Sequence, residues 1–127
     1  MRGGATGLGS NSYRDLVAWQ LAIELTDQIY ACSRSWPRDE LFGLTSQVRR
    51  AAVSVAANIA EGQGRNGDRE FVNHLGIAHG SLCEVETLLV IATRQSYLSS
   101  DKESNILALT SRVAGLIHGL KKSLRQT

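Results

Sequence analysis

Residues 54–70 read SVAANIAEGQGRNGDRE, and this stretch is either a phosphate-binding loop or a turn between two helices. A P-loop needs a preceding strand and the spacing G-x-x-x-x-G-K-[ST], and a dinucleotide loop needs G-x-G-x-x-G inside a βαβ unit. Gly62, Gly64 and Gly67 fit neither spacing, and a helical pattern precedes them. We therefore predict a helix-to-helix turn in which Gly62 ends the first helix with a positive φ.

Two helices flank this turn. The upstream helix begins near residues 39–45, and its expected apolar stripe consists of Leu44, Val48, Ala51, Val55 and Ile59. The downstream helix spans about residues 68–96, with Asn66 or Asp68 as the predicted N-terminal cap. Its apolar residues alternate at four and three positions, as in helical bundles: Phe71, Leu75, Ala78, Leu82, Val85 and Leu89.

Two further helices are expected outside this pair. The first spans about residues 15–35 and ends before Pro37, which disfavours a helical conformation at the preceding residue. Its expected face consists of Leu16, Trp19, Ile23, Thr26 and Tyr30, widened by Leu21, Leu25 and Ile29. The last begins at a predicted capping box, Ser100 to Glu103. Its apolar positions are Ile106, Leu109, Val113, Leu116, Ile117, Leu120 and Leu124.

No segment alternates β-branched residues, so no sheet is expected. Four helices with short connections predict an all-α fold, an antiparallel up-down four-helix bundle over residues 13–127, after a flexible tail over residues 1–12. The small residues Ala52, Ala56 and Ala60 predict a close helix approach. The second helix is apolar on nearly every side, which indicates contacts on two faces and a homo-oligomeric ring.

Composition excludes few classes of function. The chain has 127 residues, of which 43% are apolar, and a formal net charge of +2. No apolar run reaches the roughly 18 to 20 residues of a membrane span, so no membrane partner is expected. Cys32 and Cys83 form no C-x-x-C motif, which suits a reducing, cytoplasmic location. We expect Cys83 to be a core residue.

A polar stripe follows the second helix and continues on the third; it comprises Gln47, Arg50, Ser54, Asn58, Glu61, Ser81 and Glu84. We interpret it as a structural network in which Arg50 pairs with Glu84 or Glu61, rather than as a carboxylate active site. No E-x-x-H motif is present, and His74 and His79 are too far apart around a helix to chelate one metal, while His118 stands alone. No catalytic residue, metal, cofactor or small-molecule substrate is predicted.

Basic residues supply the candidate contacts to RNA or DNA. Arg65 and Arg69 flank the turn, and Lys121, Lys122 and Arg125 lie at the C-terminus. A helix N-terminus next to arginines can hold an anion weakly. Two functions remain open: a non-enzymatic scaffold that binds nucleic acid, and a protein-interaction ring in which the basic residues serve solubility.

The stretch from Trp36 to Gly62, WPRDELFGLTSQVRRAAVSVAANIAEG, resembles the family of 23S rRNA intervening-sequence proteins. Trp19-Gln20-x-Ala22 before it agrees, as do Ile77-Ala78-x-Gly80-Ser81-x-x-Glu84 and Tyr97-Leu98 after it, so the resemblance covers about residues 13–125. Ala56 departs from it, because members often have a proline there, and predicts a straighter helix.

The resemblance implies a bacterial, antiparallel four-helix bundle whose subunits assemble into a five-fold ring, a homopentamer. A distant relative is a basic, nucleic-acid-binding accessory of a reverse transcriptase in diversity-generating retroelements. Members are often encoded within insertions in 23S rRNA genes, although many are encoded elsewhere, and an association with ribosomal RNA is one expectation. The resemblance brings no enzymatic activity to any residue of this chain.

Overall fold

The computed structural model describes residues 12–65 and 67–125. This part of the chain contains no strand and four α-helices: α1 (Val17–Ser33), α2 (Leu44–Gln63), α3 (Asp68–Arg94) and α4 (Ser100–Arg125). Two short 3-10 helices, η2 (Tyr13–Asp15) and η3 (Arg38–Glu40), precede α1 and α2. The predicted tail lies outside the described residues, apart from Ser12, whose hydroxyl accepts a hydrogen bond from the Arg14 N–H in η2.

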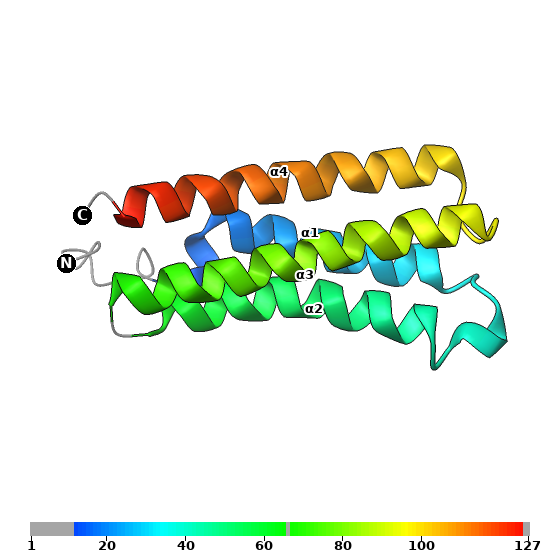
Figure 1. Cartoon of the computed structure of the whole chain (residues 1–127), viewed down its shortest axis with the longest axis horizontal. Helices are drawn as coiled ribbons and strands as arrows, with labels where there is room; N and C mark the ends of the chain where they lie inside the picture. The colour runs from blue at the N-terminus through cyan, green and yellow to red at the C-terminus, as the bar shows by residue number, and fades with distance from the viewer. Residues whose placement is uncertain (1–11, 66, 126–127) are drawn as a thin grey trace.

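Consecutive helices run in opposite directions, so the predicted antiparallel bundle is confirmed (Figure 1). Each helix packs against its neighbour in the chain, and α4 returns to pack against α1, whereas the backbones of the diagonal pairs α1–α3 and α2–α4 lie farther apart. The most extensive contact lies between α2 and α3. Ala52 and Ala56 on α2 are both buried, and the Ala52 carbonyl accepts from the Thr26 hydroxyl of α1 at 3.4 Å, so Ala52 lies at the contact with α1.

The core stripes predicted for α2 and α3 are buried throughout. On α4, the predicted residues are buried except Leu116 and Leu120, which are partly buried against the core. The face predicted for α1 is correct at Leu25 and Ile29, which are buried, and wrong at Ile23 and Tyr30. Ile23 and Tyr30 are 38% and 37% exposed. The residues of α1 that are buried are Ala18, Ala22, Leu25, Ile29, Cys32 and Ser33. The apolar surface of α1 is therefore wider than the part of the helix that the core buries. The buried Ala18 and Ala22 lie on the side of α1 that faces the neighbouring helices.

The turn between α2 and α3 differs from the prediction. α2 continues through Gly62 to Gln63, and Gly62 is buried inside the helix. A Cβ atom at Gly62 would lie 2.7 Å from the Cβ of His74 and 2.9 Å from Cδ1 of Phe71. Glycine is therefore needed there for close helix packing. The positive φ, 109°, occurs at Gly67, directly before α3.

Both predicted N-terminal caps also need correction. The N-cap position of α3 is Gly67, and no side chain caps the helix there. Asp68 lies in the first turn of α3, where its negative charge interacts favourably with the positive end of the helix dipole. The alternative cap, Asn66, lies outside the described residues. At α4 the capping residue is Ser99 rather than Ser100, because its Oγ accepts from the N–H of Lys102 at 3.2 Å.

Among the helices described, only α3 is both long and apolar enough to be a candidate membrane span. By length and composition it could cross a membrane, with a mean hydropathy of 1.5 over its most apolar window, contrary to the expectation from sequence. The core helix of a bundle has the same profile, and 39% of that window is buried here. The remainder of its surface therefore includes apolar residues that face outward, among them Ile77, Val90 and Ile91.

Candidate nucleic-acid interface

The predicted basic residues gather at one end of the bundle. Because adjacent helices are antiparallel, the α2–α3 turn and the C-terminus of α4 lie at the same end (Figure 1). Arg65 and Arg69 therefore share this end with Lys121, Lys122 and Arg125. The start of α1 also lies here, and it adds Arg14, whose guanidinium lies 5.6 Å from the Tyr13 ring centroid. Sequence analysis missed Arg14.

Arg69 and Arg125 come from different helices and line the same groove. Arg69 lies in the first turn of α3 and Arg125 in the last turn of α4. The groove has a volume of about 330 Å³, and the other residues along it are Asp68, Val72, Asn73 and Leu124. Leu124 is buried, so it holds the end of α4 against the bundle and fixes where Arg125 begins.

The other basic residues at this end of the bundle differ in their ion pairing and in their exposure to solvent. Arg65 Nη2 forms an ion pair with Glu61 Oε2 at 2.8 Å, and both side chains are about half exposed. Such i, i+4 pairs contribute only about 0.3–0.5 kcal/mol, so a phosphate could compete for Arg65. Lys121 is partly buried and Lys122 is exposed. The positive charges of Lys122 and Arg125 also interact favourably with the negative, C-terminal end of the α4 helix dipole.

Carboxylates moderate the charge of this end. Glu61 pairs with Arg65, and Asp68 and Glu70 lie in the first turn of α3. These acidic groups oppose an anion at the α3 N-terminus. A polyanion bound here would therefore be held by the arginines and lysines rather than by the helix dipole.

The predicted polar stripe separates into two sets. Ser54 and Ser81 share a hydrogen bond of 2.8 Å between α2 and α3. Asn58 Nδ2 donates to the Ser54 carbonyl and hydroxyl at 2.9 and 3.1 Å. Asn58 Oδ1 lies 3.1 Å from Nδ1 of His74. His74 was not predicted to belong to this network, although it lies seven residues before Ser81 and so on the same face of α3.

The remaining residues of the stripe are solvent-exposed and outside the network; they are Gln47, Arg50, Glu61 and Glu84. Glu61 pairs with Arg65, and no ion pair joins Arg50 to Glu84 or Glu61 among the residues described. The stripe follows the edge of the α2–α3 interface. Short side chains turn into this interface there, whereas the long ones extend into water.

Histidine and cysteine positions correct two further predictions. His118 does not stand alone, because its ring lies 4.9 Å from that of His79 between α3 and α4. No set of three or more metal-ligating side chains occurs within residues 12–65 and 67–125. Cys83 is exposed, whereas Cys32 is buried, and burial raises the pKa of the Cys32 thiol.

Residues 14–119 match the family model described as 23S rRNA-intervening sequence protein. The chain belongs to this family. No curated protein matches it. The crystal structure of a protein of unknown function from the S23 ribosomal protein family of Bacteroides thetaiotaomicron has a similar fold, with a TM-score of 0.77. The two chains are 22% identical over 84% of this chain and 96% of the other.

Within this 23S rRNA-intervening sequence protein, α2 runs without a break from Leu44 to Gln63. Ala56, the departure noted in the sequence, is 6% exposed in the middle of that helix. Because alanine keeps the backbone N–H that proline lacks, α2 retains its hydrogen-bond ladder at this position. The small side chain also preserves the tight contact with the neighbouring helices.

Proposed function

We propose that this protein is a non-enzymatic, oligomeric scaffold of the cytoplasm that binds nucleic acid, specifically RNA, through the basic end of the bundle. The observation that carries the proposal is the groove shared by Arg69 and Arg125. Two arginines on separate helices can contact two phosphates of one strand, and guanidinium groups bind phosphate in a bidentate geometry. Membership in the family described as 23S rRNA-intervening sequence protein supports the choice of RNA.

A single chain offers few such contacts. Its net charge is +2, and three carboxylates lie close to the proposed interface. Assembly would overcome this limit, because several copies of one weak site on one particle bind a polymer with a much higher overall affinity. The proposed RNA binding therefore depends on a homo-oligomer, for which the resemblance suggests a pentameric ring.

The outer surface of α3 supports assembly. Ile77, Val90 and Ile91 are 54%, 41% and 40% exposed on this helix. Between Asn73 and Arg94 the only charged side chain that is exposed on α3 is Glu84. A surface with so few charges is typical of a protein–protein contact rather than of a solvated helix face.

Exposed glycines inside α3 and α4 point to the same surface. A Cβ atom at Gly76, Gly80, Gly115 or Gly119 would meet nothing within 4 Å. Each glycine in a helix interior costs about 1 kcal/mol relative to alanine, and packing within the chain gives no reason for it. The close approach of a helix from a second copy would provide one. We call Gly76, Ile77, Gly80, Gly115 and Gly119 the assembly face.

RNA binding measured as a function of salt tests the proposed function. For the unmodified protein, we expect the logarithm of the affinity to fall linearly with the logarithm of the salt concentration. The double variant Arg69→Gln/Arg125→Gln should bind every RNA more weakly, and its salt slope should be smaller by at least about 1. The control Arg94→Gln/Arg112→Gln removes the same charge from exposed positions outside the groove and should change the slope less.

Two results would contradict the proposal. If neither RNA nor DNA binds at low salt, the protein-interaction ring without a nucleic-acid partner becomes the better interpretation. If both double variants lose affinity equally, the attraction comes from net charge alone and the groove has no special role. The mass of the particle, measured on the same samples, shows whether a loss of binding follows from loss of assembly.

A further inference from the structure

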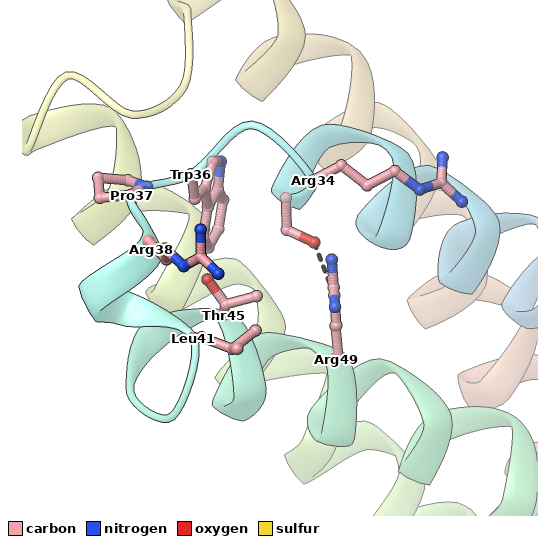
Figure 2. Close-up of a pocket in the computed structure, with 8 residues that line it drawn as sticks. Arg34, Trp36, Pro37, Arg38, Leu41, Thr45 and Arg49 are labelled. Atoms are coloured by element: carbon pink, nitrogen blue, oxygen red, sulfur yellow. Dashed lines mark hydrogen bonds between the residues drawn. The ribbon is translucent and has the colours of Figure 1, made fainter.

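A second pocket lies at the opposite end of the bundle, where the α1–α2 connection folds over the first turns of α2 (Figure 2). Its volume is about 330 Å³. The residues that line it are Ser33, Arg34, Trp36, Pro37, Arg38, Leu41, Thr45 and Arg49. Three of these are arginines and none is acidic, so we call it the arginine pocket.

Arg49 is held in place by neutral groups. Its Nε donates to Ser33 Oγ at 2.9 Å, and that hydroxyl donates in turn to the carbonyl of Ile29 at 2.7 Å. The guanidinium also lies over the ring of Tyr30, 4.7 Å from the ring centroid. These contacts orient Arg49 without neutralising it. Its terminal nitrogens make no hydrogen bond to the residues described and are available to a ligand.

One polar atom of the pocket is buried without a partner in the described part of the chain. Trp36 is 6% exposed, and its Nε1 has no hydrogen-bond partner in the described part of the chain. Thr45 is 3% exposed, and its hydroxyl makes no hydrogen bond to these residues either. Buried polar groups are nearly always paired in folded proteins. The buried, unpaired N–H of Trp36 and the unpaired hydroxyl of Thr45, beside free guanidinium groups, therefore indicate a site that a ligand completes.

The carboxylate of Glu40, in the same connection, is already engaged. Glu40 Oε2 accepts from the Tyr97 hydroxyl at 3.1 Å, and Oε1 accepts from the N–H of Leu44 at 3.2 Å. Glu40 does not line the pocket, and neither does the exposed Asp39. Arg38 and Arg49 reach the pocket from η3 and α2, while Arg34 extends away along α1 (Figure 2). The charge inside the pocket is thus positive and uncompensated.

We propose that the arginine pocket binds a phosphate monoester. Arg38 and Arg49 supply charged donors, and Thr45 and Trp36 supply neutral ones, which together match the several acceptor oxygens of a phosphate. Its volume is near the lower end of ligand pockets, about 300–1,000 Å³, so part of the molecule that carries the phosphate also fits. That molecule is either a free nucleotide-sized compound or the end of a polynucleotide. The proposal is independent of the basic groove at the other end.

Indole N–H resonances in ¹H–¹⁵N NMR spectra provide the test. Trp36 lines the pocket, and Trp19 on α1 provides an internal reference, because its partners include Tyr13 in η2 at the far end of the bundle. Titration with inorganic phosphate and with adenosine monophosphate should shift the Trp36 resonance saturably and leave that of Trp19 in place. A Trp36→Phe variant assigns the two resonances.

Matched variants identify the donors. Arg38→Gln should weaken the binding of adenosine monophosphate by about tenfold or more, as expected for loss of a charge-assisted hydrogen bond. Thr45→Val, which keeps the side-chain shape, should weaken it by about threefold or more. The control Arg112→Gln lies on the exposed surface of α4, and its affinity should stay within about twofold of the unmodified protein. Melting curves confirm that each variant is folded.

Failure of both probes to shift Trp36 saturably would overturn the proposal, as would equal weakening by Arg112→Gln and Arg38→Gln. An oligonucleotide with a 5′-phosphate, compared with the same oligonucleotide ending in a 5′-hydroxyl, identifies the source of the phosphate. A preference for the phosphorylated end supports a polynucleotide terminus as ligand. Binding of adenosine monophosphate without such a preference supports a free small molecule.

Discussion

The Oγ atoms of Ser54 and Ser81 lie 2.8 Å apart and form a hydrogen bond between α2 and α3. Asn58 and His74 extend this contact along the same interface toward Gly62. At Gly62 the two helices are so close that an added Cβ atom would overlap atoms of α3. A shift of one helix by a single turn, about 5.4 Å, would break every one of these contacts. The polar chain therefore fixes the register of the α2–α3 pair, which core side chains of similar size specify less strictly.

Ser54→Ala and Ser81→Ala should each lower the free energy of unfolding by about 1 kcal/mol, because each leaves a half-buried hydroxyl without its partner. The double variant should cost less than the sum of the two, with a coupling of about 0.5–1.5 kcal/mol. Urea denaturation of the four proteins in the cycle measures this coupling. Strict additivity would show that the two hydroxyls do not stabilise each other.

Arg50→Ala is the control for the same interface. Arg50 is exposed on α2, so its replacement should change the free energy of unfolding by no more than about 0.5 kcal/mol. A loss of about 3 kcal/mol would instead show a buried ion pair, as the sequence pattern first indicated. The comparison therefore separates the two sets of residues within the polar stripe.

Gly62→Ala should destabilise the protein by about 1–3 kcal/mol, because the new Cβ would overlap backbone-proximal atoms of α3. The nearest are His74 Cβ at 2.7 Å and Phe71 Cδ1 at 2.9 Å. Helix propensity alone would give the opposite sign, with a gain of about 1 kcal/mol. The neighbouring Gly64→Ala is the control, since its Cβ would meet only carbonyl oxygens at 3.7 Å. A stabilised Gly62→Ala variant would show that α3 moves aside at little cost.

Much of the fold could be predicted because a long amphipathic helix repeats its apolar residues many times. The stripes of α2, α3 and α4 were predicted correctly on this basis. On α1, the pattern was broader than the buried face, so Ile23 and Tyr30 were placed in the core in error. The role of Gly62 depends on His74 and Phe71 of another helix. Single-helix periodicity contains no information about such a neighbour.

The candidate sites differ in how far the sequence determines them. Antiparallel topology alone places Arg69 and Arg125 at one end of the bundle, so the basic groove follows from the fold prediction. The arginine pocket does not. Arg38 and Arg49 meet only because the connection after α1 folds back over α2, and no periodic signal describes the path of that connection. The motif around Trp36 and Pro37 marked this segment without revealing its geometry.

Ser96→Gly should stabilise the protein by about 1 kcal/mol. Ser96 has a φ of 67°, and it ends α3 with hydrogen bonds from its own N–H to Thr93 and from that of Tyr97 to Ala92. This arrangement is a Schellman motif, whose left-handed residue is usually glycine. Thermal unfolding should show a rise of a few degrees. Ser96→Ala, the control, keeps the strained φ and should not raise the melting temperature.

Light scattering at micromolar concentration should give a mass about five times the 13.8 kDa of one chain. Ile77→Lys places a charge on the assembly face and should produce smaller particles, because an unpaired charge in an interface is costly to desolvate. Ser104→Lys adds the same charge at an exposed position of α4 outside this face and should leave the mass unchanged. A monomeric unmodified protein would remove both the ring and the multivalent binding that depends on it.

The two cysteines should report assembly at the level of single residues. Cys83 is exposed and lies seven residues after Gly76, on the same side of α3, so a second copy on the assembly face should cover it. Cys32 is buried, and its raised pKa keeps the thiol protonated and slow to react at pH 8. With a disulfide reagent, Ile77→Lys should therefore show one fast and one slow thiol, whereas the assembled protein should show two slow ones. Cys83→Ser in the Ile77→Lys background should abolish the fast phase and so assign it. Equally fast labelling of Cys83 in both proteins would mean that this part of α3 faces solvent in the assembly, and the interface would have to lie elsewhere.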